Sequence, residues 1–150
     1  MPNLYPDLYP VFEAPDIVQQ SQSAVIYGES WGFDFKTGQF VKDSGNRLRK
    51  TDGHSAWVQW CIKAILTMRF AHVAYSYNYG LESDEITQQP DRASKQAEME
   101  RGITETILSD PRAEWVRDFA YTWSGDSCIV SFTLKPKIGP ITKMEVTLDE

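Results

Sequence analysis

The longest apolar pattern in the chain covers residues 55–71. Gln59, Lys63 and Thr67 are spaced four residues apart, which places them on one narrow polar stripe of a helix. Apolar side chains hold almost all of the remaining positions. A helix that is apolar around most of its circumference is normally buried. The pattern therefore predicts a central core helix with a thin polar face.

A second helical pattern, over residues 93–109, is apolar on one side only. Its apolar stripe consists of Met99, Ile103, Thr106 and Ile107. Lysines and glutamates occupy many of the other positions, so we expect this helix to pack on the core with one face. Pro90 should break any helix in the polar segment that precedes it.

Three alternating segments follow in the last third of the chain. The first, "EWVRDFAYTW", has one face made of Trp115, Phe119, Tyr121 and Trp123, with Arg117 among them. The second, "CIVSFTLK", places on one face Cys128, Val130, Phe132 and Leu134. The third, "ITKMEVTL", does the same with Met144, Val146 and Leu148. Because short turn sequences separate these segments, they predict a three-stranded antiparallel meander.

An aromatic alternation nearer the N-terminus predicts a β-hairpin. Trp31, Phe33 and Phe35 share one face, and a turn at residues 36–38 precedes the returning strand. The predicted fold class is therefore α+β. It combines an N-terminal extended arm and hairpin, two to three helices around one buried central helix, and the C-terminal meander.

The chain divides into an extended arm over residues 1–20 and a single domain over residues 21–150. The arm begins "MPNLYPDLYPVFEAP" and carries four prolines, which remove backbone donors and favour extended conformations. Its Tyr5, Tyr9 and Phe12 make it too apolar for a free tail. Two placements stay open: the arm folds back on its own domain, or it lies on a neighbouring subunit.

The charge of the chain narrows the range of partners. With 15 Lys and Arg against 21 Asp and Glu, the formal net charge is −6. Binding to nucleic acid needs a basic surface, and the short cluster of Arg47, Arg49 and Lys50 is typical of a solvated loop. No apolar run reaches the ~18 residues that cross a bilayer, and no signal-peptide pattern opens the chain. We expect no nucleic-acid partner, no membrane partner, and synthesis in the cytoplasm.

The cysteines and histidines suggest structural positions. Cys61 and Cys128 lie in unrelated apolar contexts without metal-ligand spacing, so they are either two buried thiols or one disulfide. His54 and His72 have no partner at a ligand or catalytic spacing. These residues indicate neither a metal nor a cofactor.

Carboxylate pairs of the kind that cleave glycosides can be drawn in this sequence. Candidate pairs are Glu82 with Asp84 or Glu85, and Glu105 with Asp110. A chain with 21 acidic residues produces such pairs by chance. The residues by themselves therefore indicate no catalytic site.

Five fragments, taken in order, resemble one protein family. They are "WGFDFKTGQFV", "AWVQWCIKAILTMRF", "YSYNYGLES", "ITETILSDPRAEWVRDF" and "IVSFTLK". The most specific features are Thr67-x-Arg69, Tyr79-Gly80-x-Glu82 and Asp110-Pro111-Arg112. The fragments resemble the baseplate wedge and sheath-initiator family of contractile phage tails, in the branch of Gram-positive prophages and phage-tail-like bacteriocins. The likeness covers about residues 31–148, and Asp110 stands where the family's usual triplet has glutamate.

The resemblance implies a structural baseplate protein of a virion or tail-like particle, assembled in the bacterial cytoplasm. Its partners would be the tail sheath protein, baseplate wedge proteins and tail tube or hub proteins, with several copies in a ring. It would join the wedge to the first sheath ring by β-augmentation, in which an extended arm adds to an unpaired strand edge. Family members sometimes carry a lysozyme label. The alternative is thus a tail-associated, peptidoglycan-cleaving enzyme, for which no acid and nucleophile pair is found here.

The resemblance places the acceptor strands in the meander, at residues 128–135 and 141–148. The sheath-binding side chains expected there are Cys128, Val130, Phe132, Leu134, Ile141, Lys143, Glu145 and Thr147. The alternative is an ordinary sheet that is fully covered by the domain's own helices.

The sequence also supports specific predictions for two arginines and for the corner at residues 110–112. Arg69 and Arg112 lie beside apolar residues, where a charge without a partner is costly. We expect Glu82 or Asp110 to neutralise at least one of them; the alternative is two surface arginines over aromatic rings. Pro111 pushes Asp110 out of the helical region. The triplet should therefore end one helix, start a single turn and direct the chain into the meander.

Overall fold

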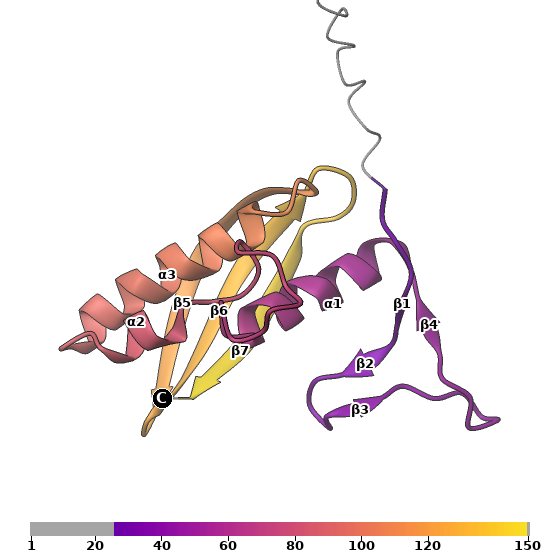
Figure 1. The fold of residues 1–150 in the computed structure, drawn as a ribbon, viewed down its shortest axis with the longest axis horizontal. Coiled ribbons are helices and arrows are strands. Elements are labelled where there is room, and N and C mark those ends of the chain that lie inside the picture. Colours follow the sequence, from indigo (N-terminus) through magenta and orange to yellow (C-terminus); the bar gives the residue numbers. More distant parts are fainter. Residues whose placement is uncertain (1–25, 150) are drawn as a thin grey trace, which may run out of the picture.

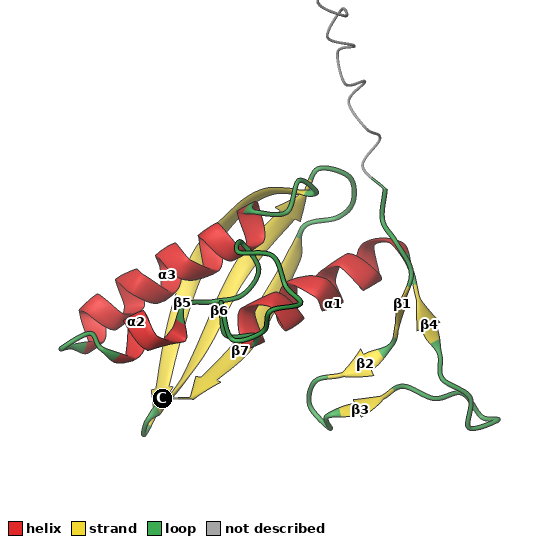
Figure 2. Cartoon of the chain, viewed as in Figure 1, coloured by secondary structure: helices red, strands yellow, loops and turns green. Residues whose placement is uncertain are grey.

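The computed structural model describes residues 26–149 and has an α+β fold (Figure 2). Its helices are α1 (Gly53–Leu66), α2 (Ser83–Thr87) and α3 (Arg92–Leu108). Its strands are β1 (Ser30–Trp31), β2 (Phe33–Asp34), β3 (Gln39–Phe40), β4 (Lys50–Thr51), β5 (Ala113–Ser124), β6 (Ser127–Pro136) and β7 (Thr142–Asp149). The predicted arm, with Tyr5, Tyr9 and Phe12, lies outside the described residues.

The three longest strands form the predicted meander. They pair antiparallel in the order β5-β6-β7, so β6 is central and β5 and β7 are the two edges. Helices α1 and α3 lie on the same face of this sheet (Figure 1). The side chains of β6 alternate accordingly, and every second one is fully buried against the helices. The alternation read from the sequence is confirmed for this strand.

The core lies between the sheet and two helices. Helix α1 contributes Trp57, Cys61 and Ile65, and α3 contributes Ile103 and Ile107, all at most 2% exposed. These side chains form one hydrophobic cluster with the inward residues of the sheet. Fully burying a large apolar side chain contributes about 1.5–3 kcal/mol, so this cluster dominates the hydrophobic stabilisation.

The apolar pattern predicts a helix that extends to residue 71, whereas α1 ends earlier, at Leu66. Thr67 already has an extended backbone, with φ −96° and ψ 126°. Its carbonyl accepts the Leu81 N–H at 2.8 Å, and the Arg69 N–H donates to the Leu81 carbonyl at 2.9 Å. Pairing with a distant segment thus replaces the last helical turn. Met68 and Phe70 are consequently 45% and 66% exposed instead of buried.

The polar stripe expected on α1 does not face solvent at Gln59, which is only 7% exposed. Its side-chain oxygen accepts the Phe33 N–H at 3.0 Å, and its side-chain nitrogen donates to the Trp31 carbonyl at 2.6 Å. Gln59 therefore holds the N-terminal hairpin against the central helix.

The predicted hairpin is present and continues beyond the β2–β3 pair. Phe33 pairs with Phe40, and β1 pairs antiparallel with β4 further along the same ribbon. Gly32 joins the two pairs, because its N–H donates to the Arg49 carbonyl and its carbonyl accepts the Val41 N–H, both at 2.8 Å. The ribbon extends away from the sheet (Figure 1).

Strand β5 departs from strict alternation at a β-bulge. Its register with β6 shifts after Arg117, and Asp118 there has a φ of 61°. A bulge inserts an extra residue and so reverses which side chains face the core. Val116 is therefore the buried residue, and the prediction that Trp115 shares the inner face with Phe119 is wrong. The Arg117 guanidinium lies outside, 5.0 Å from the centre of the Trp115 ring.

Two smaller features complete the fold. Both cysteines are buried and no disulfide joins them, which decides between the alternatives that the sequence left open. Burial raises the pKa of the Cys61 thiol. The polar segment before Pro90 contains the short helix α2, which the sequence pattern did not predict and which buries Ile86.

Candidate functional site

Strand β7 presents an unpaired edge. It pairs with β6 through eight consecutive residue pairs, from Ser127 with Asp149 to Leu134 with Thr142, without a register shift. Within residues 26–149, no other strand pairs with it. Its outward N–H and C=O groups therefore form a row that is open to another extended segment.

Strand β6 cannot serve as an acceptor in this sheet. Its backbone is paired with β5 on one side and with β7 on the other. Its predicted binding residues Cys128, Val130, Phe132 and Leu134 are 0% exposed. The expectation that residues 128–135 accept a strand is thus incompatible with the observed strand order.

The residues predicted on β7 are accessible. Lys143, Glu145 and Thr147 are exposed on the face opposite the helices. Ile141 directly precedes the strand and is 59% exposed. Of the two strands that were expected to accept a partner strand, β7 is therefore accessible.

A groove of about 720 Å³ runs beside β7. Strand β7 contributes residues 145–147 to its lining, and α1 contributes Ile62 and Leu66. The hairpin contributes residues 33–36, which are two phenylalanines together with Asp34 and Lys36. Leu66 is 50% exposed, although it belongs to the most apolar helix. We call this space the β7 groove. Its walls combine a strand edge with apolar, aromatic and charged side chains.

The apolar wall continues toward the C-terminal end of the strand. A second cavity, of about 210 Å³, is lined by residues 147–149 together with Leu81, Ile86 and Met99. Leu66 lines this cavity as well as the β7 groove. The last three residues of β7 thus also border apolar surface.

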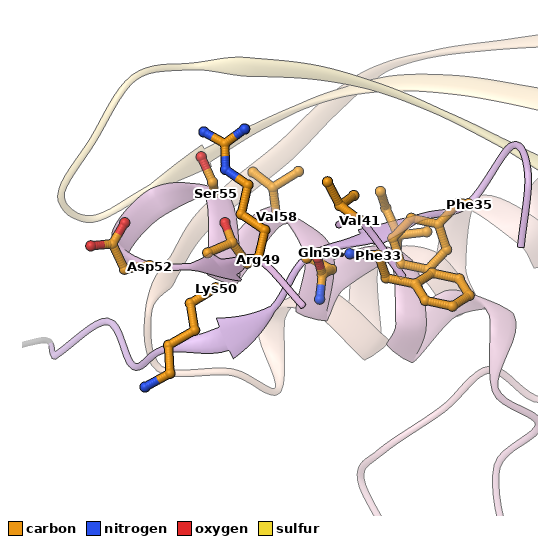
Figure 3. Close-up of a pocket in the computed structure, with 12 residues that line it drawn as sticks. Phe33, Phe35, Val41, Arg49, Lys50, Asp52, Ser55, Val58 and Gln59 are labelled. Atoms are coloured by element: carbon orange, nitrogen blue, oxygen red, sulfur yellow. Dashed lines mark hydrogen bonds between the residues drawn. The ribbon is translucent and has the colours of Figure 1, made fainter. Parts of the chain in front are cut away.

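The hairpin wall of the groove is ordered by its own aromatic contacts. The Phe33 ring lies 5.0 Å from the Phe35 ring and 5.3 Å from the Phe40 ring, both edge-on. The first two rings also line a cleft of about 500 Å³ between the hairpin and α1 (Figure 3). Arg49 and Lys50 lie at the end of this cleft that is away from the phenylalanines (Figure 3).

Arg69 and Glu82 form the expected ion pair, and it closes a loop. Arg69 Nη1 lies 2.7 Å from Glu82 Oε1, with the two side chains 12% and 25% exposed. Arg69 Nε and Thr106 Oγ1 both donate to the Gly80 carbonyl, each at 2.9 Å. Gly80 has a φ of +104°, and a Cβ there would lie 2.7 Å from a backbone oxygen. Two of the motifs that carry the family resemblance thus form the neck of one loop, residues 67–80.

Asp110 and Arg112 form a second ion pair at the corner before β5. Asp110 Oδ1 accepts the Arg112 backbone N–H at 2.8 Å and its Nε–H at 2.9 Å. The Asp110 side chain is 5% exposed, and its hydrogen bonds raise the pKa of Arg112. Arg112 also lies over Trp60, 5.5 Å from the ring centre. The Ala113 N–H donates to the Asp110 carbonyl at 3.1 Å, which closes the single turn predicted from the sequence.

The sequence of this chain matches a known family over most of its length. Residues 29–139 match the contractile injection system sheath initiator family. The chain belongs to this family. It is also similar to the phage-like element PBSX protein XkdS of Bacillus subtilis strain 168, at 30% identity over 141 residues, which are 93% of this chain and 95% of that protein. The family resemblance is confirmed: the protein is a structural baseplate or sheath component of a phage-tail-like contractile system.

Four of the five carboxylates considered for catalysis in this sheath initiator are engaged in ion pairs, namely Glu82, Glu85, Glu105 and Asp110. Glu82 and Asp110 hold the two arginines described above, and Glu105 Oε1 lies 2.8 Å from Arg101 Nη1. Neither the family nor the relative supports the lysozyme-like alternative. Among residues 26–149, no group of three or more His, Cys, Asp or Glu side chains is placed to hold a metal ion. In the same part of the chain, no helix has the length and apolar character that a membrane span requires.

Sequence reasoning did not identify the β7 groove of the sheath initiator. The apolar pattern assigns Leu66 to the interior, because it gives no sign that the helix ends at this residue. Phe33 and Phe35 do carry a local signal, since alternating aromatic residues mark one face of a hairpin. Their position beside β7 depends on the Gln59 hydrogen bonds, which no local pattern encodes.

Proposed function

We propose that this sheath initiator joins the baseplate wedge to the first sheath ring and recruits sheath subunits by accepting an extended strand at the edge of β7. The observation that carries the proposal is a regular, unpaired strand edge beside a groove that exposes both apolar and charged side chains. The partners are then the tail sheath protein, baseplate wedge proteins and tail tube or hub proteins, around which several copies form a ring. The role is structural and requires no catalytic residue or cofactor. The particle that contains the protein is assembled in the bacterial cytoplasm.

In this proposal, backbone pairing provides affinity and the groove selects the partner. A strand added to β7 places alternate side chains on the same face as Met144 and Val146. That face is the one against which α1 packs, so these side chains enter the groove toward Ile62 and Leu66. Covering the exposed part of Leu66 contributes about 25 cal/mol per Å² of apolar surface.

The other face of the added strand lies beside polar and charged side chains. Lys143, Glu145 and Thr147 point away from the helices, so the neighbouring side chains of an added strand are exposed beside them. A segment with alternating apolar and polar residues fits both faces, whereas a uniformly apolar or uniformly charged segment does not. The partner strand is thus expected to have the same alternation as β7.

The substitution Leu66→Glu tests this proposal. Leu66 is 50% exposed, so the change leaves the core of the free protein in place. In the complex, the carboxylate would be buried against an apolar strand without a partner, which is costly. We expect recruitment of purified sheath protein, measured by binding titration, to weaken at least about tenfold, or roughly 1.4 kcal/mol.

Leu108→Glu is the matched control, because Leu108 is 45% exposed at the end of another helix, α3. It should recruit sheath protein as the unaltered chain does. Both variants should unfold at nearly the same urea concentration as the unaltered chain, which excludes a folding defect. Equal recruitment by the two variants would contradict the proposal.

A further inference from the structure

The loop over residues 67–80 concentrates exposed apolar side chains. Five of them are at least 45% exposed: Met68, Phe70, Val73, Tyr75 and Tyr77. Isolated exposed apolar residues are ordinary, whereas a contiguous group of this kind marks an interaction surface, where tyrosine and phenylalanine are enriched. We call this segment the aromatic loop. The role proposed for β7 does not use it.

The aromatic loop is held in place at several points. The Arg69–Glu82 ion pair and the Gly80 hydrogen bonds close its neck. Ser109 Oγ, just after α3, donates to the Asn78 carbonyl at 3.2 Å. A binding surface that is already positioned loses little conformational entropy when it is occupied.

The rings of the loop continue onto helix α1. The Tyr75 ring lies 4.7 Å from the Tyr79 ring, and the Tyr79 ring lies 5.6 Å from the Trp60 ring. On the outer part of the loop, Phe70 contacts Tyr77 at 6.3 Å. The Tyr75, Tyr79 and Trp60 rings thus connect the loop to the central helix, and Phe70 and Tyr77 form a further pair on the loop. We call these five rings the aromatic platform.

The N-terminal part of the described chain lies beside one end of this platform. Residues 28–30 line a cavity of about 170 Å³ together with Trp60 and Arg112. Tyr27 is fixed nearby through an edge-on contact with the Trp57 ring at 6.3 Å. The first described residues of the domain therefore lie close to Trp60.

We propose that residues 2–15 of the same chain bind the aromatic platform. This segment has prolines at positions 2, 6, 10 and 15, and it contains Tyr-Pro twice. Proline-rich segments pay little entropy on binding, and they dock against surfaces lined with aromatic rings. Its Tyr5, Tyr9 and Phe12 supply further apolar surface, which matches a platform built almost entirely of apolar side chains.

The connection is long enough for binding within one chain. Residues 16–26 separate the segment from the anchored Tyr27, and these eleven residues span at most about 40 Å. This reach exceeds the roughly 20 Å length of a 14-residue helix such as α1. A tether of this length gives an effective concentration in the millimolar range, so even a weak contact is well occupied. The bound segment covers the exposed rings of the free subunit.

Photo-crosslinking in the full-length chain tests the proposal. Tyr77, 84% exposed, is replaced by p-benzoylphenylalanine, which leaves the core untouched, and the irradiated protein is digested and analysed by mass spectrometry. We expect the major crosslinks to join position 77 to residues 2–15, in a product that runs as a monomer. Combining this label with Tyr5→Ala, Tyr9→Ala and Phe12→Ala should lower the yield at least fivefold.

Phe40 is the matched control site, because it is an aromatic residue of 49% exposure on the hairpin. The same label there should give at least fivefold fewer crosslinks to residues 2–15. Three results would overturn the proposal. They are equal yields from the two sites, the absence of crosslinks between position 77 and the segment, and crosslinks found only in dimers, which would place the segment on a second copy.

Discussion

The two edges of the three-stranded sheet are built differently. β5 pairs with β6 through a register that shifts twice, and Asp118 in its second irregularity has a φ of 61°. β7 pairs with the same central strand through eight uninterrupted residue pairs. Helix α3 packs against β5, whereas a groove of about 720 Å³ lies beside β7.

This difference shows how a sheet can reserve one edge for a partner. Bulges and charged side chains prevent an edge from pairing with other chains. Only β5 has the bulges, whereas both strands expose charged side chains, Glu114 and Arg117 on β5 and Lys143 and Glu145 on β7. The regular edge of β7 meets the geometric requirement for an added strand. We attribute the addition of the partner strand to β7, and not to β5, to this difference in regularity between the two edges.

The largest effect is expected at the corner that anchors β5. Arg112→Ala leaves the Asp110 carboxylate, 5% exposed, without its ionic partner. Removing one member of a buried ion pair costs several kcal/mol, and because Arg112 itself is 23% exposed, we expect about 2–4 kcal/mol less stability. Urea denaturation measures this loss. Arg112→Lys should recover only part of it, because lysine lacks the planar fork that contacts both carboxylate oxygens.

The start of β7 provides the comparison for that experiment. There, Thr142 Oγ1 lies 3.1 Å from His54 Nε2 and 3.4 Å from the Pro140 carbonyl, which are uncharged hydrogen-bond partners at a partly exposed site. Thr142→Ala should therefore cost no more than about 1 kcal/mol. Equal losses for Arg112→Ala and Thr142→Ala would mean that the two edges are anchored alike, contrary to our account.

A smaller effect is expected at the bulge itself. Asp118 occupies the left-handed region, which aspartate tolerates better than β-branched residues do. Asp118→Gly should raise the free energy of unfolding by about 0.5–1 kcal/mol, and Asp118→Val should lower it by about 1–2 kcal/mol. Thermal and urea denaturation measure both changes. If valine were as stable as aspartate, the irregularity of β5 would not depend on this conformation.

Local patterns predicted the regular parts of this fold. The alternation in β6 and β7 and the apolar character of α1 depend on period alone, and the core residues Phe132, Val146 and Trp57 lie where the patterns place them. The corner at Asp110 was also predictable, because a proline restricts the residue before it. The ion pairs of Arg69 and Arg112 followed from the cost of burying an unpaired charge.

The errors arose where distant segments decide the local structure. Helix α1 ends at Leu66 because Thr67 pairs with Leu81, which lies in another part of the sequence. Trp115 faces outward because of a bulge whose position depends on pairing with β6. The β7 groove joins α1, the hairpin and β7, so no single segment contains its signature.

Hydrogen exchange of the two edge strands, with and without bound sheath protein, tests the central claim most directly. In the free protein, the amides of β7 that point away from β6 should exchange rapidly, because they have no partner among the described residues. We predict that sheath binding slows exchange at least tenfold within residues 142–149 and leaves residues 113–124 unchanged. Protection confined to β5, or no new protection in β7, would contradict the account.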